Sequence, residues 1–180
     1  MNLPNKLTVA RIVLIPLFVF FMIRGLFGDV DKWIALAIFI IAAITDYLDG
    51  AIARERNLVT NFGKFMDPLA DKLLVSAALI CLMAVSSLSP WVVIIIISRE
   101  FIISGFRLIA SNSGIVIAAG IWGKAKTVSQ MTMIIILIAD LGGIFYTLGQ
   151  ISIWAAVALT IFSLIDYIYR NRKVLTRGGM

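Results

Sequence analysis

Residues 33–53 read WIALAIFIIAAITDYLDGAIA, and this run indicates the class of structure. From Trp33 to Ile44 every residue is apolar, and the run matches the roughly 20 residues that an α-helix needs to cross a bilayer. Asp46 and Asp49 follow near its end, where ionisable side chains are costly and usually functional. The run therefore predicts a membrane-spanning helix with a polar end that carries chemistry.

The composition of the whole chain agrees with a membrane protein. Hydrophobic residues make up 61% of the 180 residues and charged residues 14%, against roughly 45–50% and 25% in soluble proteins. The mean hydropathy is +1.03. A water-soluble fold of this size could not bury so many apolar side chains. Soluble globular, disordered, collagen-like, coiled-coil and disulfide-stapled secreted classes are therefore excluded.

Six apolar segments are long enough to span a bilayer. They predict an all-α, polytopic membrane protein that forms a single domain over residues 1–180. Gly149 is expected in the connection between the last two spans. The six segments run roughly from Leu7 to Ile23, Trp33 to Ala53, Phe65 to Val85, Trp91 to Ala110, Val128 to Leu148 and Ile151 to Tyr169.

The basic residues predict the orientation of these spans. Most of the 16 Lys and Arg residues lie near the termini and in the connections after the second and fourth spans, while the three opposite connections hold only Arg24 and Lys32. By the positive-inside rule both termini face the cytoplasm. The net charge of +6 is interpreted as topology and contact with anionic lipids, not as nucleic-acid binding. We expect a multi-pass protein of the cell membrane with its active site on the cytoplasmic side.

Several residues are expected to have structural roles. The chain has no histidine, which excludes Ser-His-Asp and Cys-His catalysis, and its single cysteine, Cys81, is expected to be a small buried hydrophobe. Asp166 and Arg170 have the i,i+4 spacing of a local ion pair on a helix. Asp140, near the outer end of the fifth span, is expected to cap or pack.

Four acidic residues form the main candidate site. Asp46 and Asp49 share one helix face, Asp67 and Asp71 share another, and the short connection between them makes the two helices antiparallel neighbours. Pairing with Arg54, Lys64 and Lys72 would offset only part of the repulsion among four converging carboxylates. Two divalent ions would neutralise them, and hard oxygen ligands suit Mg²⁺ or Mn²⁺. Paired divalent ions are a recurring device for phosphoryl transfer.

Small residues accompany the acids. Gly50, Ala53 and Gly63 lie on the same turns, and their spacing leaves open whether they contact a neighbouring helix or a flat ligand.

The full pattern is Asp46-x2-Asp49-Gly50-x2-Ala53-Arg54-x8-Gly63-x3-Asp67-x3-Asp71, and it resembles the signature of the CDP-alcohol phosphatidyltransferases at every position. Three further segments are similar to the bacterial phosphatidylglycerophosphate synthase branch of that family. They are Pro4-Asn5-x-Leu7-Thr8-x2-Arg11, Ser98-Arg99-Glu100-Phe101-x3-Gly105-x-Arg107 and Gly123-Lys124-x-Lys126-Thr127.

The resemblance implies a reaction and a set of roles. Such enzymes transfer a phosphatidyl group from CDP-diacylglycerol to an alcohol and release CMP, and in this branch the acceptor is sn-glycerol 3-phosphate. Asp46, Asp49 and Asp67 would ligate two metal ions, while Asp71 would reach the second ion and act as general base. The resemblance also suggests a homodimer. Contacts to the cytidine and the pyrophosphate would come from Asp49, Gly50, Ala53, Arg54 and Gly63.

The resemblance also guides the remaining polar residues. Arg99, Arg107, Lys124 and Lys126 are candidates for the acceptor's phosphate; Arg99 and Arg107 lie eight residues apart, near one helix face. Alternatively, the two arginines balance Glu100 and anchor the helix among lipid headgroups. Asn5, Thr8 and Arg11 would help to close the donor site, or would cap the first helix at the interface.

Other functions remain open at this point. A member of the same family could use inositol phosphate, serine or phosphatidylglycerol as acceptor. A polyprenyl transferase also uses aspartate-rich helices and Mg²⁺, but with a different spacing and a longer chain. A cation transporter could place four acids at one membrane site, although it would be expected to show repeated halves or broken helices.

Overall fold

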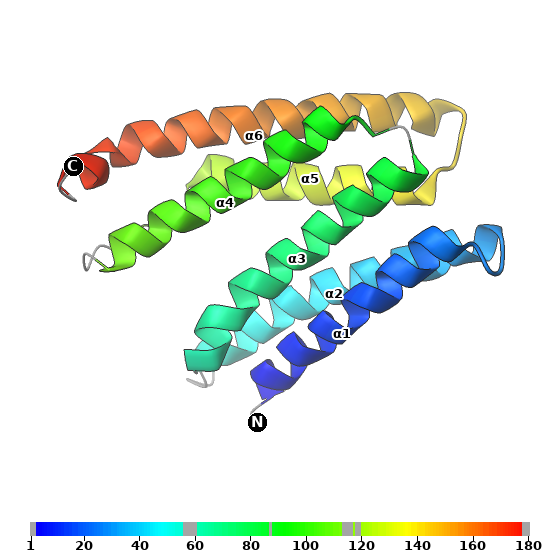
Figure 1. The fold of residues 1–180 in the computed structure, drawn as a ribbon, viewed down its shortest axis with the longest axis horizontal. Helices are drawn as coiled ribbons and strands as arrows, with labels where there is room; N and C mark the ends of the chain where they lie inside the picture. Colours follow the sequence, from blue (N-terminus) through cyan, green and yellow to red (C-terminus); the bar gives the residue numbers. More distant parts are fainter. Residues whose placement is uncertain (1–2, 56–60, 87, 113–116, 118–119, 178–180) are drawn as a thin grey trace. The chain divides into compact units, whose positions relative to one another are not determined.

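The computed structural model describes residues 3–55, 61–86, 88–112, 117 and 120–177, and these residues form six helices and no strand (Figure 1). The all-helical prediction is therefore confirmed. For residues 3–4, 46–55, 61–62, 64–65, 112 and 173–177 the description covers the backbone alone. The helices are α1 (Leu3–Arg24), α2 (Asp29–Glu55), α3 (Asn61–Val85), α4 (Pro90–Asn112), α5 (Ile121–Ala139) and α6 (Ile144–Arg177).

Three of the helices are long and apolar enough to cross a membrane: Asn5–Arg24 of α1, Met66–Val85 of α3 and Ile144–Arg172 of α6. The chain is thus a membrane protein, while the prediction of six spans is met only in part. Three charged residues, Arg99, Glu100 and Arg107, lie within α4, and α5 carries Lys124 and Lys126 near its start. The described side chains of α2 end at Thr45.

The chain divides into two compact units, Met1–Leu88 with Leu137–Asp140, and Ser89–Ile136 with Leu141–Met180. In the first unit α1 packs extensively against both α2 and α3, which contact each other much less. Small side chains at Ala35 and Ala42 are fully buried and let α1 and α2 approach closely. The ring centroids of Phe18 and Phe39 lie 5.9 Å apart, with the rings tilted by 47°. The expected burial of Cys81 is confirmed, at 2% exposure.

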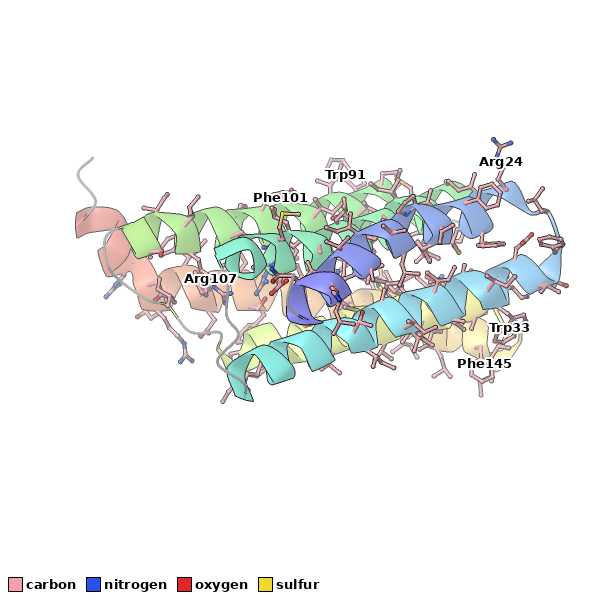
Figure 2. The ribbon with its side chains drawn as sticks, turned by 90° about the horizontal axis from the view of Figure 1, so that it is seen from below. Arg24, Trp33, Trp91, Phe101, Arg107 and Phe145 are labelled. Atoms are coloured by element: carbon pink, nitrogen blue, oxygen red, sulfur yellow. The ribbon has the colours of Figure 1, made fainter. Side chains whose placement is uncertain are left out.

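The second unit is organised around the contact of α4 with α6. Phe106 of α4 meets Tyr167 of α6 edge to face, with ring centroids 5.5 Å apart, and Ile103 and Leu164 complete a small core. On the exposed side of α4, Trp91 and Phe101 project outward (Figure 2). The predicted pair of Asp166 and Arg170 is confirmed, with Arg170 Nε 2.7 Å from the carboxylate.

The boundary between α5 and α6 differs from the prediction. We expected the fifth helix to run from Val128 to Leu148, but α5 starts at Ile121 and ends at Ala139. Asp140 (φ 40°), Gly142 (φ 68°) and Gly143 (φ 55°) have left-handed backbones that break the helix, and glycine adopts them at little cost. Gly149 instead lies buried inside α6. The apolar run from Ile144 to Leu148 hid the true break, because hydrophobicity alone does not distinguish two adjoining helices from one.

Candidate active site

The acids of the sequence signature lie on the end of α2 and the start of α3, at one end of the first unit. The start of α1, the end of α2 and the start of α3 lie together there (Figure 1). Thr8 of α1 is fully buried, and its hydroxyl donates a 2.5 Å hydrogen bond to Oδ1 of Asp67 on α3. A hydroxyl is neutral, so this bond fixes the orientation of the Asp67 carboxylate without cancelling its charge.

Arg11 connects α1 to the other acidic helix. Its side chain is fully buried, and Nε donates to the backbone oxygen of Ala42 on α2, at 3.2 Å. The hydroxyl of Thr45 donates to the same oxygen, at 2.8 Å. That oxygen belongs to the turn that leads to Asp46, since an α-helical carbonyl accepts from the residue four positions later. Thr8 and Arg11 thus hold the two acidic helices from a common element.

The two acids of α3 lie one helical turn apart. Asp67 and Asp71 are both half-buried, and the i,i+4 spacing places them on one face, as predicted. Pro68 lies within α3 and cannot donate to the carbonyl of residue 64, so the turn that carries Asp67 has one helical bond fewer. Gly63 is buried two residues after the helix begins, and Asn5 is half-buried in the first turns of α1.

The remaining predicted donor-site residues fall on the last turns of α2. The helical backbone continues to Glu55, so Asp46 and Asp49 keep the spacing that puts them on one face. The side chains concerned lie outside those that the structure describes; they are Asp46, Asp49, Gly50, Ala53 and Arg54. Among the described residues no group of three or more His, Cys, Asp or Glu side chains is close enough to hold a metal ion.

The chemistry of the donor set nevertheless fits a hard divalent cation. Asp67 and Asp71 supply carboxylate oxygens on one helix face, and the first of them is oriented by a neutral donor. Mg²⁺ and Mn²⁺ prefer such oxygen ligands, and metal-binding carboxylates are commonly held by a further hydrogen bond. The described residues therefore suit half of the predicted four-carboxylate site.

A second polar cluster lies in the other unit, on α4 and α5. Oε1 of Glu100 accepts from Arg99 Nη1 at 2.9 Å and from Lys126 Nζ at 2.5 Å. The guanidinium of Arg99 also lies against α5, because a Cβ added to Gly123 would be 3.7 Å from its Nη2 atom. Two of the four predicted acceptor residues, Arg99 and Lys126, are thereby brought together.

The other two acceptor candidates are exposed. The Arg107 guanidinium lies 5.8 Å from the ring centroid of Tyr167 on α6, and Lys124 stands in the first turn of α5. Arg99 and Arg107 consequently contact different helices and do not share a face. Eight residues at about 100° each leave two side chains about 80° apart around the helix axis, which accounts for the difference.

Several of these side-chain contacts could not be predicted from the sequence. The sequence left open whether Thr8 closes the donor site or caps the first helix, and it did not predict the bond from its hydroxyl to Asp67, 59 residues away. The sequence predicts Glu100 only as a counter-charge to the arginines, and it gives no sign of the contact between Tyr167 and Arg107. One signal for Glu100 was available, because an acid between apolar segments requires buried partners.

Comparison with known proteins identifies a matching protein family and several similar proteins. The protein-family model described as CDP-alcohol phosphatidyltransferase matches residues 1–162. A Bacillus subtilis (strain 168) protein named CDP-diacylglycerol–glycerol-3-phosphate 3-phosphatidyltransferase is 44% identical, over 97% of each chain. A Rickettsia bellii (strain RML369-C) protein of the same name is 38% identical, over 96% of each chain. A Mycobacterium tuberculosis (strain ATCC 25618 / H37Rv) protein named probable phosphatidylglycerophosphate synthase is 36% identical, over 99% of this chain and 85% of its own length.

Proposed function

The chain belongs to the CDP-alcohol phosphatidyltransferase family, and from this premise we propose that it transfers a phosphatidyl group from CDP-diacylglycerol to sn-glycerol 3-phosphate. The products are phosphatidylglycerol phosphate and CMP. The observation that carries this proposal is the nearly full-length similarity to enzymes that bear this activity in their names. The carboxylates of Asp67 and Asp71 on one face of α3 support the proposal, because they would supply metal ligands for such a reaction.

The donor's diphosphate would be bound through metal ions. Asp46, Asp49, Asp67 and Asp71 would hold two divalent ions, Mg²⁺ or Mn²⁺, which when bound offset negative charge on the diphosphate and on the departing CMP. The Thr8 hydroxyl keeps the Asp67 carboxylate oriented for this task. The nucleotide would lie against the small residues of the signature, with Asn5 and Arg11 closing the site. Those contacts would come from Asp49, Gly50, Ala53, Arg54 and Gly63.

The transfer itself is a single displacement. The acceptor's hydroxyl oxygen bonds to the phosphorus of the phosphatidyl group, and the bond from that phosphorus to the bridging oxygen breaks. The electron pair leaves with CMP, and Asp71 takes the hydroxyl proton as general base. Positioned proton transfer of this kind commonly contributes about 10²–10⁴-fold to the rate. No covalent enzyme intermediate is needed.

The acceptor's phosphate would be bound by basic residues of the second unit. A phosphate monoester is a dianion at neutral pH, and hydrogen bonds from charged donors are roughly twice as strong as neutral ones. Arg99 and Lys126 are already brought together on α4 and α5. Arg107 and Lys124 add two exposed cations on the same helices.

The distribution of Lys and Arg along the chain supports a proposal for the number of spans and their orientation in the membrane. We propose six spans within one domain, both termini and the active site on the cytoplasmic side, and a homodimer of the chain. The excess of Lys and Arg at the termini and in two connections supports this orientation. The α6 helix has 34 residues, about 50 Å at 1.5 Å per residue, so it would extend beyond a hydrocarbon core of about 30 Å.

The purified protein tests this function with a panel of acceptors. With CDP-diacylglycerol, labelled glycerol 3-phosphate should enter lipid and release one CMP for each lipid formed. Inositol phosphate, serine and phosphatidylglycerol should react poorly. A preference for one of them would show that the acceptor is wrong while the transfer chemistry stands. If no acceptor reacts and the protein instead moves divalent ions across liposomes, the transporter alternative would replace the enzyme.

A further inference from the structure

The aromatic ring of Tyr167 is fixed in the small core of the second unit. Tyr167 lies on α6, is 7% exposed, and meets Phe106 of α4 edge to face, with ring centroids 5.5 Å apart. Ile103 belongs to the same buried cluster, and Ile117 and Leu164 pack against it. Close packing leaves an enclosed ring few orientations, so its hydroxyl has a defined position.

The hydroxyl of Tyr167 is buried without a hydrogen-bond partner. Within the described part of the chain, no group donates to this oxygen or accepts from it. The hydroxyl of a buried tyrosine usually finds a partner, and one that lacks a partner in the protein requires an explanation. Phenylalanine would fill the same space without burying a polar atom. The hydroxyl therefore indicates a bound ligand rather than a packing role.

A cation stands beside the same ring. The guanidinium carbon of Arg107 lies 5.8 Å from the centroid of the Tyr167 ring, near the outer limit of about 6 Å for a cation–π contact. Arg107 is exposed, and among the residues that the structure describes it forms no ion pair with a carboxylate. The contact with the ring face uses none of the five N–H donors of the guanidinium. A phosphate group is an acceptor that suits both a guanidinium and a hydroxyl.

We propose that Tyr167 is a further binding residue for the acceptor substrate, its hydroxyl donating, together with Arg107, to the acceptor's phosphate group. This inference rests on the proposed function, in which Arg107 binds that phosphate. The guanidinium supplies the positive charge, and the hydroxyl supplies a donor whose position is set by the packing of α4 against α6. Hydrogen bonds to an ionised phosphate are shorter and stronger than those between neutral groups. The pair therefore favours an acceptor that carries a phosphate over one that carries only hydroxyls.

The alternative is that Tyr167 is an ordinary interfacial tyrosine whose hydroxyl meets water or a lipid headgroup. Tyr169, two residues later, has the surroundings of such a tyrosine. It is 67% exposed, and the guanidinium carbon of Arg172 lies 5.0 Å from its ring centroid. Tyrosines of this kind are typical of the membrane–water interface. Both rings thus have an arginine beside them, but only the hydroxyl of Tyr167 is buried, and Tyr169 is the matched control.

Tyr167→Phe removes the hydroxyl alone. The ring contacts with Phe106 and Arg107 are kept, so the thermal midpoint should not fall. The KM for glycerol 3-phosphate should rise about tenfold, the lower end for a hydrogen bond to a charged group, while kcat and the donor's KM stay within about twofold. The inhibition constant of inorganic phosphate, competing with glycerol 3-phosphate, should rise by the same factor. Tyr169→Phe should leave all of these values unchanged.

The lipid composition separates the two possible sources of phosphate. In vesicles of phosphatidylcholine alone the raised KM of Tyr167→Phe should persist, because the partner is the acceptor and not an anionic headgroup. A difference that appears only when an anionic phospholipid is added would overturn the inference. So would an unchanged acceptor KM, unchanged inhibition by inorganic phosphate, or equal rises in both KM values with a lower thermal midpoint. Each of these results would leave the transferase function intact. Failure of the wild type to use glycerol 3-phosphate would reject the function itself, before any variant is compared.

Discussion

Two half-buried carboxylates in this protein have opposite surroundings. Asp67, in the first unit, accepts from the neutral hydroxyl of Thr8, on a helix that carries a second acid one turn later. Glu100, in the second unit, accepts from two cations at the same oxygen. One acid is thus oriented by a neutral donor, and the other is paired with two cations.

The contrast indicates how two side-chain carboxylates can suit opposite ligands. A carboxylate oriented by a neutral donor retains its attraction for a cation, as a metal site requires. A carboxylate shared by two cations holds those cations side by side, and charged donors of this kind form strong hydrogen bonds to phosphate groups. Under the proposed function, the neighbouring donor, rather than the acid itself, would determine whether each region binds a cation or an anion.

The strongest test of this contrast is Asp67→Asn. The change keeps the shape and the Thr8 contact but removes a charge that the proposed metal site needs, so turnover should be abolished. Activity of the wild type should be lost on chelation and return with Mg²⁺ or Mn²⁺. Asp29→Asn, an exposed acid of the same unit, is the matched control and should be silent. Turnover by thoroughly metal-free protein would contradict the assignment.

A somewhat smaller loss is expected for Asp71→Asn, one turn along the same face. Removing a general base should lower kcat by about 10²–10⁴-fold. Affinity for CDP-diacylglycerol should be largely kept, because the other three carboxylates remain. Single-turnover rates and donor binding, measured separately, check both parts. A variant with a nearly normal rate would show that Asp71 is neither base nor essential ligand.

The exposed cations of the second unit should affect binding more than rate. Arg107→Gln or Lys124→Gln should raise the KM for glycerol 3-phosphate roughly 10- to 150-fold, as expected for about 1.5–3 kcal/mol per charged hydrogen bond. The donor's KM should change far less. Steady-state kinetics with each substrate varied in turn measure this. An unchanged acceptor KM in both variants would place the phosphate pocket elsewhere.

How well a side-chain contact could be predicted from the sequence depends on how far apart its two residues lie along the chain. Apolar runs predicted the helices, and short-range spacing predicted the pair of Asp166 and Arg170. The break at Gly142 and Gly143 was hidden because apolar residues continue beyond it. The bond from Lys126 to Glu100 joins residues 26 positions apart, and no local pattern encodes it. Side-chain partners across helices depend on how the helices pack, which periodicity does not determine.

A milder effect is expected where a neutral donor is removed from the acidic end. Thr8→Val keeps the shape of the buried side chain but deletes the bond to Asp67. The Mg²⁺ concentration for half-maximal activity should rise about tenfold, the low end for groups that orient a metal ligand. Thr8→Ser keeps a hydroxyl and should recover most of the affinity. Metal titrations by calorimetry give a readout independent of turnover, and equal affinities in the Val and Ser variants would exclude an orienting role.

The smallest effect should come from Gly123→Ala, beside the cluster of Glu100. The added Cβ would lie 3.7 Å from Nη2 of Arg99, an ordinary van der Waals contact, so the guanidinium need not move. Gly123 is helical and has no positive φ, and alanine there should stabilise α5 by up to about 1 kcal/mol. The KM for glycerol 3-phosphate should consequently stay within about twofold, because every charged partner of Glu100 is preserved. A large rise would mean that the acceptor itself approaches the backbone at Gly123, and that the binding surface on α5 extends beyond its charged side chains.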